Sequence, residues 1–354
     1  MSCVTLLRMQ KSRQAGKTAE FCRIREKLLI FLVASYYIFT EFVASAATEK
    51  RKKMTKQERI EQLKKEKDAV IMAHYYVVPE IQEIADYTGD SFYLSKLAQG
   101  LENKTIVYCG VGFMGESGKL LSPEKNILMP AFDADCPMAH MVTKEEVDKY
   151  RAEYEDLAVV CYINSTVEIK TWADVCVTSA NAVKIVKNLP NKNILFIPDK
   201  NLGRYVAEQV PEKNVMVVNG YCPIHNNMKV EEIRELKEAH PAAEVLVHPE
   251  CPEEICALAD YIGSTSGIIK YATESENTEF IIATEVGVLY KLQQNNPEKK
   301  FYFTETTPVC TDMKKLTLDK VIHVLETGEN QAYVKPEMTE QSSLTLERML
   351  ELAK

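Results

Sequence analysis

Short apolar runs alternate with amphipathic segments along residues 54–354, and this alternation occurs three times. Each copy opens with a run of four or five mostly apolar residues bounded by polar ones, which is typical of a buried parallel strand. A helical pattern, a second apolar run, a second helical pattern and a third apolar run follow. The predicted strands are 69–73, 105–109 and 126–129; 157–161, 193–197 and 215–218; and 244–247, 280–283 and 301–303.

The predicted helices lie between these strands. The first helix of each copy covers residues 92–101, 180–189 or 267–273, and the second is expected to open near Gly115, Gly203 or Gly287. Strands that alternate with helices indicate parallel sheets, in which functional groups lie just past the carboxyl ends of the strands.

Polar residues recur at fixed offsets in the three copies. The first strand of each copy leads into His74, Tyr162 or His248, and a hydroxyl residue follows 17 positions later at Ser91, Ser179 or Thr265. A cysteine follows 60 to 62 positions after the first of these residues, at Cys136, Cys222 or Cys310. The spacing predicts three thiols that meet on a pseudo-threefold axis.

The predicted fold class is therefore α/β. We expect three pseudo-threefold-related units, each a three-layer αβα arrangement around a short parallel sheet, with the active site at their common centre. The expected boundaries are 54–145 for the first unit, with a C-terminal contribution, 146–235 for the second, and 236–354 for the third together with the C-terminal helices.

Residues 1–53 form an N-terminal extension outside the repeat. Its apolar run of 13 residues, 28–40, is shorter than the roughly 20 that a membrane span needs. Ala44-Ser45-Ala46 resembles a signal-peptide cleavage site. Met54 begins an ordinary amphipathic helix. We favour a dispensable or mis-assigned start, with targeting and then a membrane anchor as the alternatives.

Charge and cysteine usage limit the partners and the compartment. Residues 54–354 hold 32 Lys or Arg against 47 Asp or Glu, a balance of −15 that argues against nucleic acid. Ten cysteines without close paired spacing indicate a reduced intracellular protein rather than a disulfide scaffold. We expect a cytoplasmic protein without stable membrane association.

The cysteines divide into two groups. Those in apolar, strand-like runs are expected to be buried small hydrophobic residues: Cys109, Cys161 and Cys176, and less clearly Cys251 and Cys256. The other group follows strands: Cys136, Cys222 and Cys310. Three thiolates without a fourth suit a [4Fe–4S] cluster with one open iron, a Lewis acid able to assist loss of water. The alternative is zinc, with His140 or His225 as fourth ligand.

Many short motifs, in order from about Lys56 to Glu326, resemble the quinolinate synthase family. They include Ala73 to Tyr76, Gly89-Asp90-Ser91, Gly112 to Glu116, Asp135-Cys136-Pro137, Tyr162-Ile163-Asn164, Pro198 to Gly203, Tyr221 to His225, His248-Pro249-Glu250 and Gly263 to Ser266. The resemblance implies a transferase of NAD biosynthesis that condenses iminoaspartate with dihydroxyacetone phosphate to quinolinate, water and phosphate. It also implies one [4Fe–4S] cluster per chain on Cys136, Cys222 and Cys310, and a supply of iminoaspartate from an aspartate oxidase or dehydrogenase.

The resemblance further implies roles for individual residues. His74, Ser91 and Ser179 would hold substrate carboxylate and phosphate groups, and His248, Ser264 and Thr265 would hold the acid next to the cluster. Asn164 would orient an intermediate. Proton transfer would fall to residues that also contact substrate: Tyr76, Tyr162 and Glu250. Cys310 stands alone, so a C-x-x-C-x-x-C redox disulfide is not supported.

Each assignment has a purely structural alternative. A serine before a helix is usually an N-cap, and a lone histidine at a strand end is more often structural. Glu250 precedes a helix start, where the helix dipole favours a carboxylate. For the whole chain, the alternative is a three-unit anion-binding module with structural zinc or no metal. Radical enzymes and aconitase-like dehydratases are disfavoured because their tight cysteine spacings are absent.

Overall fold

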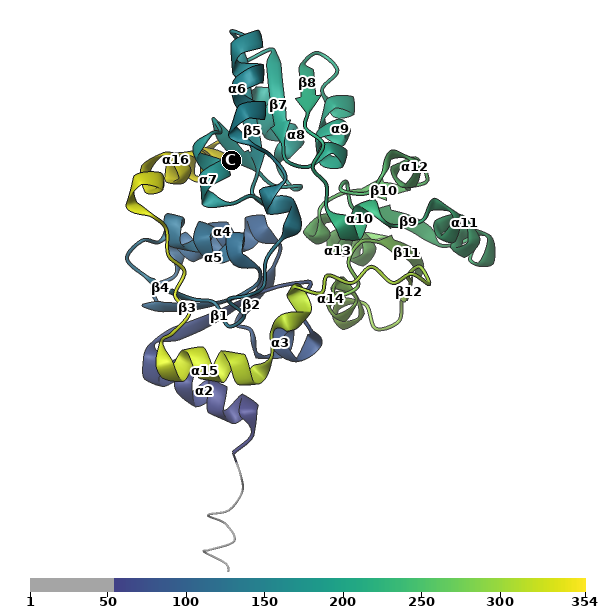
Figure 1. The fold of residues 1–354 in the computed structure, drawn as a ribbon. Coiled ribbons are helices and arrows are strands. Elements are labelled where there is room, and N and C mark those ends of the chain that lie inside the picture. Colours follow the sequence, from purple (N-terminus) through teal and green to yellow (C-terminus); the bar gives the residue numbers. More distant parts are fainter. Residues whose placement is uncertain (1–53) are drawn as a thin grey trace, which may run out of the picture. The chain divides into compact units, whose positions relative to one another are not determined.

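Three four-stranded parallel sheets with flanking helices make up the computed structural model, which describes residues 54–354 (Figure 1). The three sheets share one strand order, with the first strand of each unit second from the edge and the third and fourth strands beyond it. The prediction of three repeated α/β units is confirmed. The expectations for residues 1–53 lie outside the described residues.

The first unit contains a sheet ordered β2-β1-β3-β4. Its strands are β1 (Ala69–His74), β2 (Tyr87–Gly89), β3 (Thr105–Cys109) and β4 (Asn126–Leu128). Its helices are α2 (Lys56–Lys67), α3 (Pro79–Ile84), α4 (Ser91–Gly100), α5 (Gly112–Leu121) and the short η1 (Pro137–His140). Every residue of β1 and β3 is buried, which explains why these strands read as continuous apolar runs.

The second and third units follow the same plan. The second has β5 (Leu157–Tyr162), β6 (Val175–Val177), β7 (Asn193–Ile197) and β8 (Asn214–Val217), with α6 (Lys144–Glu153), α7 (Val167–Thr171), α8 (Ala182–Asn188), α9 (Lys200–Gln209) and α10 (Pro223–Asn226). The third has β9 (Glu244–Val247), β10 (Tyr261–Ile262), β11 (Glu279–Ala283) and β12 (Lys300–Tyr302), with α11 (Val230–Ala239), α12 (Glu253–Cys256), α13 (Thr265–Glu274), α14 (Val288–Asn295) and η2 (Met313–Lys315). Two helices complete the chain: α15 (Leu318–Thr327) and α16 (Pro336–Leu352).

Nine of the twelve strands coincide with the predicted apolar runs. The other three, β2, β6 and β10, form one edge of each sheet and are only two or three residues long. Strands β4 and β12 are also three residues long, so length alone does not explain why β2, β6 and β10 are missed. Each of these strands leads to the hydroxyl residue of its unit, which is Ser91 after β2, Ser179 after β6 and Thr265 after β10.

Glycines inside α5 and α9 bring these helices close to the sheets. A Cβ on Gly115 would lie 2.2 Å from Met129 Sδ, and one on Gly203 would lie 2.5 Å from Val217 Cγ1. Any larger residue at these positions would require the neighbouring side chains or the helix to move. The helices begin at Gly112 and Lys200, before these glycines, and in the third unit α14 begins just after Gly287.

The C-terminal helices pack on the first two units rather than on the third. Helix α15 contacts α2, and α16 contacts α7, β6 and α5. The largest core cluster is continuous through the first two sheets and includes residues of α15 and α16, whereas the third sheet has two clusters of its own. Helix α11 crosses residue 235 and contacts β11 of the third sheet. The division into domains at 145 and 235 stays a prediction.

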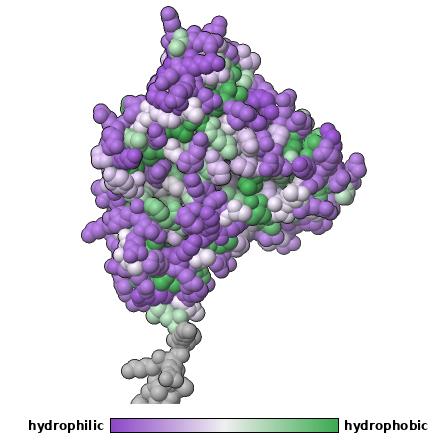
Figure 2. Space-filling model, viewed as in Figure 1, coloured by the Kyte–Doolittle hydropathy of each residue, from purple (hydrophilic) through white to green (hydrophobic). Residues whose placement is uncertain are grey.

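The surface view shows one face on which hydrophilic residues predominate and hydrophobic ones form small patches (Figure 2). Within residues 54–354, no helix is both long enough and apolar enough to cross a membrane.

Candidate active site

A cavity of about 1050 Å³, counting its open mouth, is lined by residues from all three units. His74 and Tyr162 are the last residues of β1 and β5, and His248 directly follows β9, so the cavity lies at the carboxyl ends of the first strands. The cavity brings together all but one of the site residues predicted from the sequence. These are His74, Tyr76, Ser91, Cys136, Tyr162, Asn164, Ser179, Cys222, His248, Glu250, Thr265 and Cys310.

Ser264 is the predicted site residue that does not line the cavity. It is the N-cap of α13, and its hydroxyl accepts a hydrogen bond from the Gly267 backbone N at 3.2 Å. The next residue, Thr265, faces the cavity. In the first unit Asp90 caps α4 by accepting from Tyr93 N, and both Asp90 and Ser91 line the cavity. Ser91 is therefore not an N-cap.

The three cavity cysteines are positioned by carboxylates. The backbone N–H of Cys136 donates to Asp135 Oδ1 at 2.8 Å, that of Cys222 to Asp199 Oδ2 at 3.1 Å, and that of Cys310 to Glu285 Oε1 at 3.1 Å. By contrast, Cys109, Cys161 and Cys176 lie in strands and are fully buried, as expected for small hydrophobic residues. All eight cysteines of residues 54–354 are free thiols.

Glu285 also ties the third unit to the first. Lys314 Nζ lies 2.8 Å from Glu285 Oε1 and donates to the Tyr76 carbonyl oxygen at 2.5 Å. A Cβ on Gly287 would lie 2.7 Å from the Tyr76 backbone, so glycine is needed where the two units approach. These contacts fix the Cys310 segment relative to the Tyr76 loop.

His74 and His248 have the same local geometry. His74 Nδ1 accepts from the Tyr76 backbone N at 3.1 Å, and His248 Nδ1 accepts from the Glu250 backbone N at 3.3 Å. Burial lowers the pKa of His74 to about 4 and that of His248 to about 3, so both imidazoles are neutral near pH 7. With Nδ1 accepting, Nε2 carries the proton, and each ring offers one neutral donor.

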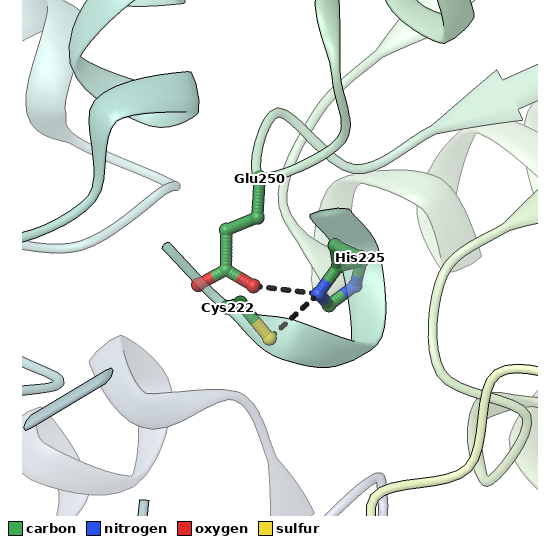
Figure 3. A group of neighbouring side chains, drawn as sticks. All are labelled: Cys222, His225 and Glu250. Atoms are coloured by element: carbon green, nitrogen blue, oxygen red, sulfur yellow. Dashed lines mark hydrogen bonds and ion pairs between the residues drawn. The ribbon is translucent and has the colours of Figure 1, made fainter. Parts of the chain in front are cut away.

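Tyr76 belongs to a chain of hydrogen bonds. Its hydroxyl lies 2.7 Å from Thr265 Oγ1 and 2.8 Å from Thr284 Oγ1, and Thr284 Oγ1 lies 2.9 Å from His225 Nε2. His225 Nδ1 then lies 2.8 Å from Glu250 Oε2 (Figure 3). The chain can pass a proton between Tyr76 and Glu250 through a threonine and a histidine.

The pKa values of the acidic groups in and beside this chain are shifted in opposite directions. Burial, and then the nearby Glu250 carboxylate, raises the pKa of both Tyr76 and Tyr162 well above the usual range, so both phenols stay protonated. Burial acts to raise the pKa of Glu250 as well, but His225, His248 and Tyr162 outweigh it and lower that pKa to about 2. The cavity therefore holds an ionised carboxylate beside two neutral phenols.

Comparison with known proteins settles the family. Residues 58–351 match the protein family described as Quinolinate synthetase A protein (NadA). This chain belongs to the quinolinate synthase family. A quinolinate synthase of Clostridioides difficile (strain 630) is 54% identical over 295 residues, 83% of this chain and 97% of that protein. Quinolinate synthases of Fusobacterium nucleatum subsp. nucleatum and Sulfurihydrogenibium sp. (strain YO3AOP1) are 54% and 48% identical over 84% of this chain, covering 99% and 98% of their own lengths.

Members of the quinolinate synthase family are [4Fe–4S] enzymes of NAD biosynthesis, and the donor set of this cavity fits such a cluster. Each unit contributes one cysteine to the lining of the cavity. Three thiols suit a cluster with one iron left open.

For several residues of this quinolinate synthase site, the sequence predicts no catalytic role. Thr178 and Thr284 line the cavity or join its hydrogen bonds, and His225 had been considered only as a zinc ligand. A signal existed for His225, because a residue three positions after Cys222 returns to the same side in one helical turn. His140, the other possible zinc ligand, is exposed and pairs with Asp135.

Proposed function

We propose that this chain condenses iminoaspartate with dihydroxyacetone phosphate to quinolinate, with release of phosphate and water, using a [4Fe–4S] cluster held by Cys136, Cys222 and Cys310. One observation carries the proposal beyond family membership. The cavity that contains the three thiols also contains buried oxygen atoms without a hydrogen-bond partner: Asn164 Oδ1, Thr178 Oγ1 and Glu250 Oε1. Each such atom costs about 1–3 kcal/mol, so their grouping indicates a polar ligand.

Substrate anions would be held by neutral donors. His74 offers its Nε2–H, and the hydroxyls of Ser91 and Ser179 line the same cavity. Ser91 is the first residue of α4, where backbone N–H groups and the helix dipole favour carboxylate or phosphate. Neutral donors hold an anion without the cost of burying a second charge.

Thr265 and His248 would hold the acid next to the cluster. Both line the cavity on the side of the third unit, and His248 stacks on His225 with ring centroids 4.7 Å apart. Ser264 contributes indirectly, since its cap on α13 fixes the position of Thr265. When bound, the cluster supplies an open iron that polarises a hydroxyl for loss of water.

Proton transfer would be divided between the phenols and the carboxylate. Tyr76 and Tyr162 are protonated near pH 7 and act as acids, whereas Glu250 is ionised and acts as the base. His225 and Thr284 return the proton along the hydrogen-bond chain to Tyr76. A dianionic substrate beside Glu250 raises its pKa, because like charges disfavour the ionised form, and this makes it a stronger base in the complex.

Asn164 would orient an intermediate through its side-chain amide. Its Oδ1 is buried and lacks a partner, so the amide can accept a hydrogen bond from a substrate hydroxyl or imine N–H. Iminoaspartate would come from an enzyme that oxidises aspartate, an oxidase or a dehydrogenase. We place the reaction in the cytoplasm, where thiols and cluster remain reduced.

Anaerobic turnover of the two substrates with detection of quinolinate tests the proposal. The expected protein is brown, contains four irons per chain and forms quinolinate. A colourless protein that contains zinc, or no metal, and that binds anions without forming quinolinate would contradict the proposal and favour a non-catalytic module. An absorbance spectrum taken before turnover separates the two cases.

A further inference from the structure

Three possible metal-binding side chains converge at one wall of the cavity. Cys222 Sγ, His225 Nδ1 and a Glu250 carboxylate oxygen all lie within 4.8 Å of one another, and the three side chains point toward a common point (Figure 3). His225 Nδ1 is 3.2 Å from Cys222 Sγ and 2.8 Å from Glu250 Oε2. Cys222 and His225 lie on one turn at the start of α10, and Glu250 lies in the loop after β9.

These separations are close to those of a zinc site. Zinc bonds of about 2.0 Å to nitrogen and oxygen and about 2.3 Å to sulfur, at tetrahedral angles, place nitrogen about 3.3 Å from oxygen and about 3.5 Å from sulfur. Both pairs in this structure would have to separate by roughly half an ångström or less to meet those values. The third pair, Cys222 Sγ and a Glu250 carboxylate oxygen, lies within 4.8 Å, against about 3.5 Å in such a site.

The surroundings also suit a metal ion. His225 and Glu250 are buried, and a divalent ion bound by one thiolate, one carboxylate and one neutral imidazole gives a site with no net charge. Thr284 Oγ1 lies 2.9 Å from His225 Nε2, so the ring nitrogen that does not face the metal has a hydrogen-bond partner. Metal-binding imidazoles usually have such a partner, which holds the ring in position.

We propose that the chain binds one Zn²⁺ through Cys222 Sγ, His225 Nδ1 and Glu250 when its cluster is absent. The three-ligand site leaves a fourth position for water, as in catalytic zinc sites. Binding releases the Cys222 thiol proton to solvent. The His225 proton moves from Nδ1 to Nε2, which then donates a hydrogen bond to Thr284 Oγ1, so the Nδ1 lone pair is free to bind zinc.

The consequence depends on the proposed cluster ligation, although zinc binding itself does not. If Cys222 holds the cluster, zinc and cluster cannot occupy the protein together. Zinc would also occupy His225 Nδ1 and the Glu250 carboxylate, and so would break the chain of hydrogen bonds between Tyr76 and Glu250. The site would thus make cluster assembly sensitive to the ratio of available zinc to available iron and sulfide.

The test uses the full-length protein after removal of cluster and metals with a chelator. Zinc sulfate is titrated against a chromophoric chelator that competes for the ion, under anaerobic conditions. We expect one zinc per chain, and a loss of affinity of more than about a hundredfold in Cys222→Ser, His225→Asn and Glu250→Gln, exceeding what loss of a supporting hydrogen bond causes. Thr284→Val should lose about ten- to a hundredfold. Circular dichroism shows whether each variant is folded.

Matched controls separate this site from the obvious alternatives. Cys136→Ser and Cys310→Ser should leave zinc affinity unchanged, and so should His140→Asn, which removes the exposed imidazole near Cys136. Among the three cysteine variants, the thiolate charge-transfer band given by Co²⁺ in place of zinc should disappear only in Cys222→Ser. If zinc instead requires Cys136 and Cys310, or binds equally to folded His225→Asn and Glu250→Gln, the proposal is wrong.

Pre-loading then tests mutual exclusion. Zinc-loaded wild-type protein, given iron and sulfide, should develop far less brown absorbance than metal-free protein, and His225→Asn should develop it equally with and without zinc. If wild type binds zinc at the three residues and still assembles a full cluster, the zinc site stands and Cys222 is not a cluster ligand. That result would overturn the exclusion and count against the proposed function.

Discussion

The first and third units present the same backbone geometry to the cavity with different chemistry. In each, a histidine at the end of the first strand accepts a hydrogen bond through Nδ1 from the backbone N–H two residues later. In the first unit that later residue is Tyr76, a partly buried phenol that holds its proton. In the third it is Glu250, a buried carboxylate that has lost its proton.

This difference teaches how a repeat can yield an asymmetric site. The backbone places equivalent side chains around one centre, and single substitutions at equivalent positions then provide an acid and a base. A second pair of positions shows the same effect. Glu285, two residues after β11, accepts from the Cys310 backbone N, whereas the equivalent residue of the first unit is Val111, and Asp135 positions Cys136 instead.

Replacing the cavity cysteines should have the largest effect on activity, because each of the three units supplies one of them. Replacing Cys136, Cys222 or Cys310 by Ala should remove the cluster and all activity, since each unit supplies one ligand. Iron and sulfide analysis of anaerobically reconstituted protein measures this. The same change at Cys109, Cys161 or Cys176, which are buried in strands, should leave iron content near normal. Four irons retained in any variant of the first set would refute the ligand assignment.

Tyr76→Phe tests the acid of the first unit. The change removes the hydroxyl that joins Thr265 to Thr284 and should lower kcat by about a hundredfold, the lower range for a lost general acid, with normal iron content. Tyr75→Phe is the matched control, because Tyr75 packs against a core cluster of the third unit and does not line the cavity. Equal losses in the two variants would show that Tyr76 acts only through packing.

His74 should make stability depend on pH. Its pKa is about 4 in the folded chain and about 6.5 in the unfolded chain, so between these values the unfolded state binds more protons. The stability due to neutral His74 is complete above pH 6.5 and is lost as pH falls toward 4, by up to about 1.4 kcal/mol per pH unit.

Urea denaturation of the cluster-free chain between pH 7 and pH 4.5 measures this dependence. His74→Asn should reduce the slope of unfolding free energy against pH by the equivalent of about one proton. If wild type and His74→Asn show the same slope, His74 is protonated in the folded chain.

Removal of residues 1–53 should have the smallest effect. A chain that starts at Met54 keeps α2, which packs on α15, and keeps every residue of the cavity. We therefore expect unchanged iron content and turnover. An insoluble or inactive shortened chain beside an active full-length one would show that the extension is needed for folding.

Much of this arrangement could be predicted from spacing alone. The recurrence of His74, Tyr162 and His248, followed at fixed distances by hydroxyls and cysteines, indicated three units with their chemistry at one centre. The sequence did not reveal β2, β6 and β10, which are only two or three residues long. It also could not show that Thr284, 59 residues from His225, joins His225 to Tyr76, because such a contact depends on how two units meet.

Helix capping is the other feature that the sequence does not determine. Ser91, Ser264 and Thr265 all stand at helix starts, and the sequence gives no means of deciding which hydroxyl caps a helix and which faces the cavity. Asp90 and Ser264 are the caps, which leaves Ser91 and Thr265 on the cavity wall.

Glu250→Gln tests the central claim most directly, because it changes only the proton affinity at the position where the third unit differs from the first. The variant should bind four irons and substrate normally and lose about a hundredfold or more in turnover, as expected for a lost general base. Iron analysis, substrate binding and single-turnover quinolinate formation are measured on the same preparation. Near-normal turnover would contradict the account, and would leave Glu250 as a structural carboxylate at the start of α12.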